Sequence, residues 1–417
     1  MQHMADVQPA APDLSLQIVE STYRANTTKE TTFNSLPQEH VDAIIDEIHN
    51  DSDLGTARRT LKSCALVSRI FVRRTRKHLF GHLSIRSIRE CQRFLACPQV
   101  HSFTTSLTII FQRRYPNDEG YPIMPTLTAL PSLVDALHNV NTIKLCGMDW
   151  KSLSQRFVDS LASRSFASVT LILTRFPDSK ALYSFLSHSP NLRQFSCFGT
   201  TIDNGDNSPF SASFDASHRP RITELRLRKM NQIPDMLLSP ALSSVNLQSL
   251  RILEVVIDGI GEFDQARRLM NLTVHSLEVL RVSYLMKRPA DPSDYLPIER
   301  LQKLQSIIID IRLYGLGIFQ WWIEHFERYP TMQCSCVHLF VVDTLADGAD
   351  WKRLDTALSR TSIRSLVVTV FMTSASTQSM IKSAIEKNLP ILMSCQIARV
   401  QPAMHNFHVL VGNFNTD

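Results

Sequence analysis

Residues 250–255 read Leu-Arg-Ile-Leu-Glu-Val, and residues 277–282 read Leu-Glu-Val-Leu-Arg-Val. Each stretch has apolar side chains at its first, fourth and sixth positions. The same spacing recurs along the chain, and successive copies from Val140 onward begin 26 to 30 residues apart. A regular period of this length predicts a repeat architecture in which each copy supplies one buried strand. The copies are Thr104/Leu107/Ile109 as a weaker first member, then Val140/Ile143/Leu145, Phe166/Val169/Leu171, Leu192/Phe195/Cys197, Ile222/Leu225/Leu227, Leu250/Leu253/Val255, Leu277/Leu280/Val282, Leu304/Ile307/Ile309, Cys334/Val337/Leu339 and Ile363/Leu366/Val368.

Helical patterns fill the segments between these strands. Apolar residues recur there at the spacing of one helix face, as in the set Leu153, Phe157, Val158 and Leu161. Strands and helices that alternate through right-handed crossovers form a parallel sheet with helices on its outside. We therefore expect an α/β fold in which residues 100–411 form a solenoid, with parallel strands inside and helices outside.

The array resembles the leucine-rich-repeat family. It departs from the family pattern three residues after the last apolar position, where asparagine or cysteine is usual. The positions here hold Met148, Thr174, Thr200, Met230, Asp258, Leu285, Arg312, Val342 and Phe371. Asparagines at this position would form a ladder that satisfies backbone groups at each turn. Because this chain lacks them, we expect an irregular solenoid. Polar, proline-containing insertions at residues 112–125, 203–220 and 287–297 are expected to be exposed loops.

The N-terminal part has a different pattern. Residues 1–33 are polar and rich in Thr, Ser, Pro and Ala, so we expect a mostly disordered tail. Residues 34–82 are then expected to form a module of three short helices. Pro37 suits the first turn of the first helix, and the other two are expected from about Thr60 and about Ser68. The apolar stripe of the first helix has the i, i+3, i+4, i+7 spacing and consists of Val41, Ile44, Ile45 and Ile48.

Motifs in this module resemble the F-box family. The chain has Leu36-Pro37-Gln38-Glu39 where the family has LPxE, and Ile44-Ile45 follows in the apolar helix. The last family motif is matched by Leu66-Val67-Ser68-Arg69-Ile70-Phe71. Ser68 and Phe71 stand where cysteine and tryptophan are common, and both changes are conservative in size. Two further stretches are similar to fungal F-box-like proteins, namely Lys62-Ser63-Cys64-Ala65-Leu66-Val67 and His78-Leu79-Phe80.

The resemblance implies a substrate-recognition adaptor of an SCF-type cullin–RING ubiquitin ligase. The F-box would bind a Skp-type adaptor, and the repeats would bind an unknown target protein. Three short helices also bury too little apolar surface to be robust alone. The alternative is a leucine-rich-repeat interaction scaffold without a ligase role, whose N-terminal helices only cap the array. The residues implied at the adaptor interface are Leu36, Pro37, Val41, Ile44, Ile45, Ile48, Leu66, Val67 and Phe71.

A basic run at residues 69–77 has two interpretations. It could be a nuclear-localisation or nucleic-acid patch. More often such a run is a solvated helix face that complements acidic neighbours, and we expect the latter here. The formal net charge of +5 over 417 residues is also well below that of a dedicated nucleic-acid binder.

Residues that alternate with the buried positions are expected on the concave surface of the sheet. One column passes through Arg226, Glu254 and Arg281, and the next passes through Phe198 and Arg228. Since arginine and aromatic residues are enriched at binding hot spots, we predict that these five residues bind an acidic or phosphorylated protein segment. The competing interpretation is an ordinary solvated sheet in which Glu254 pairs with an arginine across strands.

Several other classes of protein are disfavoured by the sequence. No stretch reaches roughly 18 apolar residues and no basic-then-apolar leader begins the chain, so we expect no membrane span, no secretory signal and a cytoplasmic or nuclear location. The eight cysteines form no CxxC pair, and GxGxxG, GK[ST], GxSxG and HExxH motifs are missing. We therefore expect no enzyme, no cofactor and no metal. His325, beside Glu324 and Glu327, is expected on the polar flank of a helix.

Overall fold

The computed structural model describes residues 37–50, 53–111, 128–203, 219–229, 237–238, 245–285, 295–311, 316–342, 345, 350–372 and 378–404. Contacts divide the chain into two compact units, residues 1–75 and 76–417. The expected tail at residues 1–33, Leu36 and the insertion at residues 112–125 lie outside the described residues, as does most of the other two insertions.

The first unit consists of helices, as the sequence predicted. They are α1 (Gln38–His49), α2 (Leu54–Val67) and α3 (Arg69–Phe80), the last of which continues past residue 75. Two helix starts differ from the prediction. Pro37 has an extended ψ of 142° and is the N-cap of α1 rather than a first-turn residue. α2 begins before Thr60, because the Asp53 carboxylate accepts a hydrogen bond from the Gly55 backbone N–H at 3.0 Å and caps the helix there.

Among the described residues of the second unit, twelve parallel strands form one sheet, and their order in the sheet follows the chain. A separate parallel pair is formed by β5 (Arg175–Phe176) and β7 (Thr201–Ile202). The strands of the large sheet are β1 (His82–Ile85), β2 (Ser106–Ile110), β3 (Thr142–Cys146), β4 (Ser168–Ile172), β6 (Gln194–Phe198), β8 (Glu224–Arg228), β9 (Ile252–Ile257), β10 (Val279–Tyr284), β11 (Ser306–Asp310), β12 (Cys336–Val342), β13 (Ser365–Met372) and β14 (Ala398–Met404).

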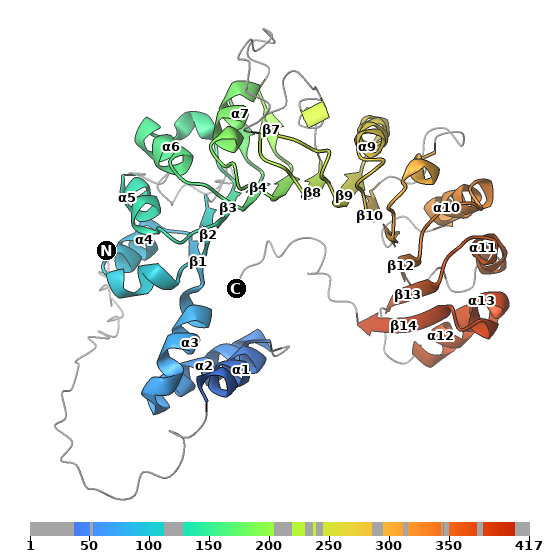
Figure 1. Cartoon of the computed structure of the whole chain (residues 1–417), viewed down its shortest axis with the longest axis horizontal. Coiled ribbons are helices and arrows are strands. Elements are labelled where there is room, and N and C mark those ends of the chain that lie inside the picture. The colour runs from blue at the N-terminus through green and yellow to red at the C-terminus, as the bar shows by residue number, and fades with distance from the viewer. Residues whose placement is uncertain are drawn as a thin grey trace, which may run out of the picture. The chain divides into compact units, whose positions relative to one another are not determined.

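Helices of the second unit lie along one side of this sheet (Figure 1). Neighbours such as α5 and α6, or α10 and α11, pack against each other. We call the opposite side of the sheet the open face; it carries the residues that alternate with the buried strand positions. The helices are α4 (Ile88–Leu95), α5 (Ala129–Ala136), α6 (Gln155–Ala162), α7 (Ser179–Ser187), α9 (Ile260–Leu272), α10 (Leu316–Arg328), α11 (Asp350–Ser359), α12 (Gln378–Lys387) and α13 (Pro390–Ser394), with 3₁₀ helices at Pro98–Phe103, Trp150–Ser152 and Ile298–Arg300.

The repeated apolar triples form the core of the sheet. Strand pairing aligns Ile143 with Val169, Val169 with Phe195, and Phe195 with Leu225, so equivalent positions share one rung. All thirty residues of the ten triples are 7% exposed or less. The spacing therefore predicted both the strands and their register, because a parallel neighbour shifted by one residue would turn its buried side chains to the other face.

The sheet extends further than the sequence predicted. β1 begins before residue 100. Its apolar triple would be Phe80, Leu83 and Ile85, but Phe80 also fits the end of the predicted third helix, so the strand could not be recognised. β14 was missed because its triple is weak, consisting of Cys395, Ala398 and Val400. β14 also contains Pro402, which is compatible with a strand at the edge of a sheet.

A residue in the left-handed region follows each of four neighbouring strands of the large sheet, β3, β4, β6 and β8. These residues are Gly147 (φ 69°), Leu173 (φ 50°), Gly199 (φ 61°) and Lys229 (φ 51°). At Gly147 a Cβ atom would lie 2.3 Å from the Phe111 carbonyl oxygen, so glycine is required there. Equivalent backbone conformations at equivalent positions turn the chain the same way after each strand.

Candidate functional site

The nine residues expected at an adaptor interface fall into distinct groups. Val41 and Ile45 are at most 1% exposed, whereas Ile44 is 50%, Leu66 is 89% and Val67 is 78% exposed. The interface prediction for Val41 and Ile45 is therefore corrected: these side chains are core residues, since α1 packs its inner side against α2. Ile44, Leu66 and Val67 leave apolar surface open to solvent, and we call these three residues the apolar patch.

The remaining predicted interface residues lie around this patch in sequence. Pro37 is exposed, and Ile48 and Phe71 are half-buried. Leu36 lies outside the described residues. α2 ends at Val67 because Ser68 takes an extended conformation, with φ −152° and ψ 145°. Leu66 and Val67 thus lie in the last turn of α2, and both side chains are exposed although α3 begins directly after Ser68.

The basic run at residues 69–77 pairs with an acidic residue in at least one place. Arg74 of α3 forms an ion pair with Asp46 of α1. This contact agrees with the prediction of a helix face that complements acidic neighbours.

Strand register places the predicted open-face residues side by side. Arg226 is aligned with Glu254, and Glu254 with Arg281, on β8, β9 and β10. Phe198 is aligned with Arg228 on β6 and β8, and both side chains are half-buried. All five predicted residues therefore belong to one continuous part of the sheet.

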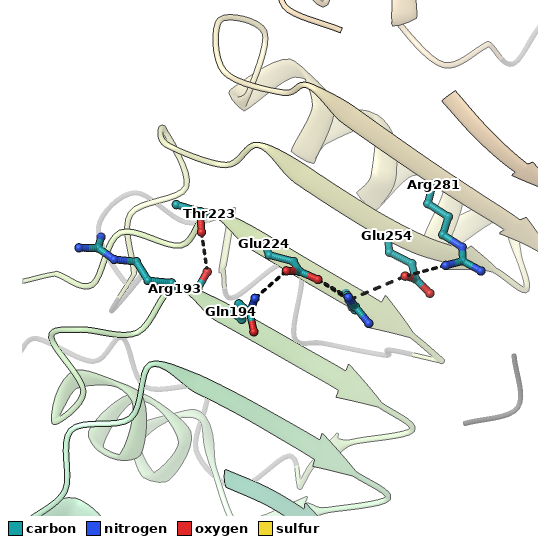
Figure 2. A network of polar contacts seen from close by, with 7 residues as sticks. Arg193, Gln194, Thr223, Glu224, Glu254 and Arg281 are labelled. Atoms are coloured by element: carbon teal, nitrogen blue, oxygen red, sulfur yellow. Dashed lines mark hydrogen bonds and ion pairs between the residues drawn. The ribbon is translucent and has the colours of Figure 1, made fainter. Parts of the chain in front are cut away.

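A network of polar contacts crosses four of these strands (Figure 2). Gln194 donates to Glu224 at 2.9 Å, and Arg226 Nε donates to the other Glu224 oxygen at 2.6 Å. Glu254 then lies between two arginines, 3.9 Å from Arg226 Nε and 3.7 Å from Arg281 Nη1. The expectation that Glu254 pairs with an arginine across strands is confirmed, and the pairing involves both neighbours.

The two arginines of this network differ in how far their donors are satisfied. Arg226 is held by a short hydrogen bond to Glu224, a residue only 8% exposed. The contact of Arg281 with Glu254 is longer than a hydrogen bond, and Arg281 Nε is buried without a hydrogen-bond partner among the described residues. Arg281 is therefore held by a longer contact than Arg226.

Next to Arg281 lies a group of rings that we call the aromatic shelf, formed by His338, Phe340 and Phe371. His338 and Phe340 are two residues apart on β12 and stack with ring centroids 4.2 Å apart. Phe371 of β13 lies 5.9 Å from Phe340. The Arg281 Cζ atom is 6.0 Å from the Phe340 ring centroid, so the shelf and the polar network adjoin.

Sequence reasoning missed several members of this surface. Gln194 and Glu224 are aligned with each other and stand two residues before the column that contains Arg226. The signal for Glu224 was its spacing of two residues from Arg226, which places both on the same face of the strand. The same alternation of His338 and Phe340 on β12 was the available signal for the shelf. Phe371 carried no such signal, because it stands three residues after the last apolar position of its repeat, where a turn was expected.

His325 corrects another prediction. It was expected on a polar helix flank, yet it is fully buried, with Nε2 2.9 Å from the Leu296 carbonyl oxygen. Tyr295 and Trp321 lie against its ring, at centroid distances of 5.1 and 4.9 Å. Burial lowers the pKa of His325 to about 3. The segment before Ile298 covers this side of α10, which a helical periodicity could not reveal.

The described residues hold no group of three or more His, Cys, Asp or Glu side chains arranged to bind a metal ion. None of the helices given above has the length and apolar composition needed to span a bilayer. No model of a known protein family matches the chain, and no curated protein matches it by sequence.

Proposed function

We propose that this protein is the substrate-recognition adaptor of an SCF-type cullin–RING ubiquitin ligase. Its N-terminal helices would bind a Skp-type adaptor, and the open face of the sheet would bind the target protein. The observation that carries the proposal is the apolar patch, because Leu66 and Val67 are 89% and 78% exposed in a unit whose described residues form three short helices. In such a small unit, this surface is best explained as one that a second polypeptide covers.

The finer assignment of the fold belongs to the same proposal. We infer an F-box-like helical module followed by an irregular leucine-rich-repeat solenoid. The regular spacing of the buried triples supports a solenoid, as does the strand order that follows the chain. Thr174 and Thr200 support the repeat assignment at the position where the family has asparagine, since their hydroxyls donate to the Leu145 and Leu171 carbonyl oxygens at 3.3 and 3.4 Å.

The proposed role requires no chemistry from this chain. An adaptor that holds a target beside a ubiquitin-carrying enzyme raises the rate through effective concentration. Such a role also fits a cytoplasmic or nuclear location, where the ligase operates. The enzyme, cofactor and metal expectations remain predictions.

The decisive experiment compares two double variants of the full chain for binding to a purified Skp-type adaptor. Leu66→Lys/Val67→Lys removes the two most exposed residues of the apolar patch but keeps α2, because lysine is a good helix former and cations are favourable near a helix C-terminus. Burial of each side chain contributes about 1.5–3 kcal/mol, so we expect at least a tenfold loss of affinity. Pro37→Ala combined with Leu36→Ala tests the LPxE motif in the same assay.

Met380→Lys is the matched control, since Met380 is also an exposed apolar helix residue, at 67%, but lies in the second unit. Circular dichroism should show the same thermal transition for all variants. Equal adaptor recovery by the wild type and the Leu66→Lys/Val67→Lys variant would remove the ligase role.

The second candidate is an interaction scaffold without a ligase role. It is favoured by the burial of Val41 and Ile45, which gives the first unit a core of its own. This candidate predicts target binding at the open face with no adaptor binding at all. The adaptor assay therefore separates the two functions.

A further inference from the structure

We propose that the open face binds a target segment in which an aromatic side chain stands near an anionic group, with the ring on the aromatic shelf and the anion on Arg281. The inference rests on the proposed function, in that the open face is the target-binding surface. It adds the chemical class of the segment and separates the residues that contact it from those that only position them.

Arg281 is the anion-binding residue of this surface. Its side chain is 26% exposed, its Nε has no hydrogen-bond partner among the described residues, and its contact with Glu254 is 3.7 Å long. A guanidinium offers five N–H donors in a planar fork that matches a carboxylate or phosphate. A partly exposed guanidinium whose contact with Glu254 is longer than a hydrogen bond is therefore suited to a ligand with two anionic oxygens.

Arg226 has a different role. Its Nε donates to Glu224 at 2.6 Å, and the same Glu224 accepts from Gln194. The network fixes Arg226 and places Glu254 between it and Arg281 (Figure 2). We assign Arg226 as a positioning residue that holds Glu254, and through Glu254 the guanidinium of Arg281.

The exposed charge on this face favours an anion. Its acidic side chains are less exposed than Arg226, with 11% for the side chain of Glu224 and 17% for that of Glu254 against 48% for that of Arg226. In the described columns, five basic residues stand against three acidic ones. The basic residues are Lys144, Arg226, Arg228, Arg281 and Arg399, and the acidic ones are Glu224, Glu254 and Asp310.

The aromatic shelf supplies the apolar part of the surface. The His338 and Phe340 rings are both half-buried and stack on each other at 4.2 Å with an interplanar angle of 27°, so their outer faces and edges are what remains for an apolar ligand group. Gln401 Nε2 donates to the Thr369 hydroxyl at 2.8 Å, and that hydroxyl lies 2.8 Å from His338 Nε2. Burial, helped by the charge of Arg281, lowers the pKa of His338, so its ring is neutral at pH 7 and receives an apolar or aromatic group well.

The distance between the two subsites sets the spacing in the ligand. Arg281 is on β10 and Phe340 on β12, with β11 between them. The side-chain groups are closer to each other than these two strands, since the Arg281 Cζ atom lies 6.0 Å from the Phe340 ring centroid. An extended peptide rises about 3.3 Å per residue, so the aromatic and anionic side chains should be about two residues apart, which also places them on the same face of the peptide.

The test uses selection from a random peptide library on the immobilised full-length protein, with sequencing of the enriched peptides. We expect enrichment of Phe, Tyr or Trp together with Asp or Glu about two positions away. A fluorescein-labelled copy of the most enriched peptide is then measured by fluorescence polarisation. Replacing its acidic residue by phosphoserine shows whether the anion prefers to be a phosphate or a carboxylate.

Variants of the protein locate the two subsites. Arg281→Ala should lower the affinity for the labelled peptide by about tenfold to a hundredfold, as expected for loss of hydrogen bonds to a charged group. Phe340→Ala should weaken it and abolish the aromatic preference, while Phe340→Leu should restore part of the affinity. Arg267→Ala is the matched control, because Arg267 is an exposed arginine on α9, on the helical side of the sheet, and its loss should leave binding unchanged.

The positioning role of Arg226 has its own readout. Arg226→Gln should weaken the acidic peptide but leave unchanged the affinity of a copy whose acidic residue is replaced by glutamine. A residue with a merely structural role would weaken both peptides equally.

Several outcomes would overturn the inference. These are the absence of any enriched motif, enrichment of basic residues, or the same affinity for wild type and Arg281→Ala when both have the same thermal transition. Enrichment of sequences matching residues 405–417 would assign the open face to a segment of this chain itself. Failure of the selection with intact adaptor binding sinks only this inference, whereas lost adaptor binding with intact selection sinks only the ligase role.

Discussion

The Asp46 carboxylate on α1 accepts two hydrogen bonds from the Arg74 guanidinium on α3, with 2.6 Å between Nε and Oδ1. This two-point contact joins the first and last helices of the first unit, and both side chains are partly shielded, at 36% and 25% exposure. Asp46→Asn should therefore destabilise this unit by about 1 kcal/mol, the upper end for a partly exposed pair. Hydrogen exchange of the α1 backbone amides in the full chain measures the change. Glu47→Gln removes the same charge from the same helix and should leave the exchange rates unaltered.

Asp355 on α11 is 1% exposed and accepts hydrogen bonds from the backbone N–H groups of Ile391 and Leu392, both at 2.9 Å. It thus satisfies the first turn of α13 from a neighbouring helix. Asp355→Ala leaves two donors without a partner and should cost about 2–4 kcal/mol of unfolding free energy. Asp355→Asn keeps one acceptor oxygen and should fall between Ala and wild type in urea denaturation. An unchanged urea midpoint for the alanine variant would show that these contacts do not hold α13.

Stability should depend on pH through His325. Its pKa is lowered by burial to about 3 in the folded protein, against 6.5 for a free histidine. The unfolded chain therefore binds one more proton between these values, and stability is lost as pH falls below 6.5, by up to about 1.4 kcal/mol per pH unit.

His325→Phe removes this proton and keeps an aromatic ring in the pocket. The variant should be less stable than wild type at pH 7, because the hydrogen bond to the Leu296 carbonyl is lost. Between pH 7 and pH 5 the difference should shrink or reverse, since only wild type loses stability through this group. Urea titrations of both proteins at the two pH values measure it, and parallel losses would show that His325 is not the titrating group.

Thr174 and Thr200 should stabilise the turns after β4 and β6. Both are buried. The Thr174 hydroxyl donates to the Leu145 carbonyl oxygen on β3, and the Thr200 hydroxyl donates to the Leu171 carbonyl oxygen on β4. Valine has nearly the same shape without the donor, so Thr174→Val and Thr200→Val should each cost about 0.5–1.5 kcal/mol. Thr356→Val is a suitable control, because Thr356 is exposed on α11. If the two buried variants change the urea midpoint no more than the control, the hydroxyls do not replace the asparagine ladder.

The sequence by itself determined the parallel sheet and its register. A buried strand must repeat its apolar positions, and parallel neighbours must align them, so Ile143, Val169 and Phe195 could be placed on one rung from their spacing alone. The same alternation placed Arg226, Glu254 and Arg281 side by side on the open face.

Only the tertiary structure decided how these side chains are satisfied. Arg226 and Arg281 are equivalent in the sequence pattern. Glu224 nevertheless accepts a hydrogen bond from Arg226 Nε, whereas Arg281 Nε has no partner among the described residues, because hydrogen bonds depend on the positions of side-chain atoms across strands. Likewise the apolar stripe of α1 could not show that Ile45 is buried while Ile44 is exposed, nor could the flank of α10 show that His325 is enclosed. Periodicity gives the direction of a side chain from its own helix or strand, whereas burial depends on which other segment packs there.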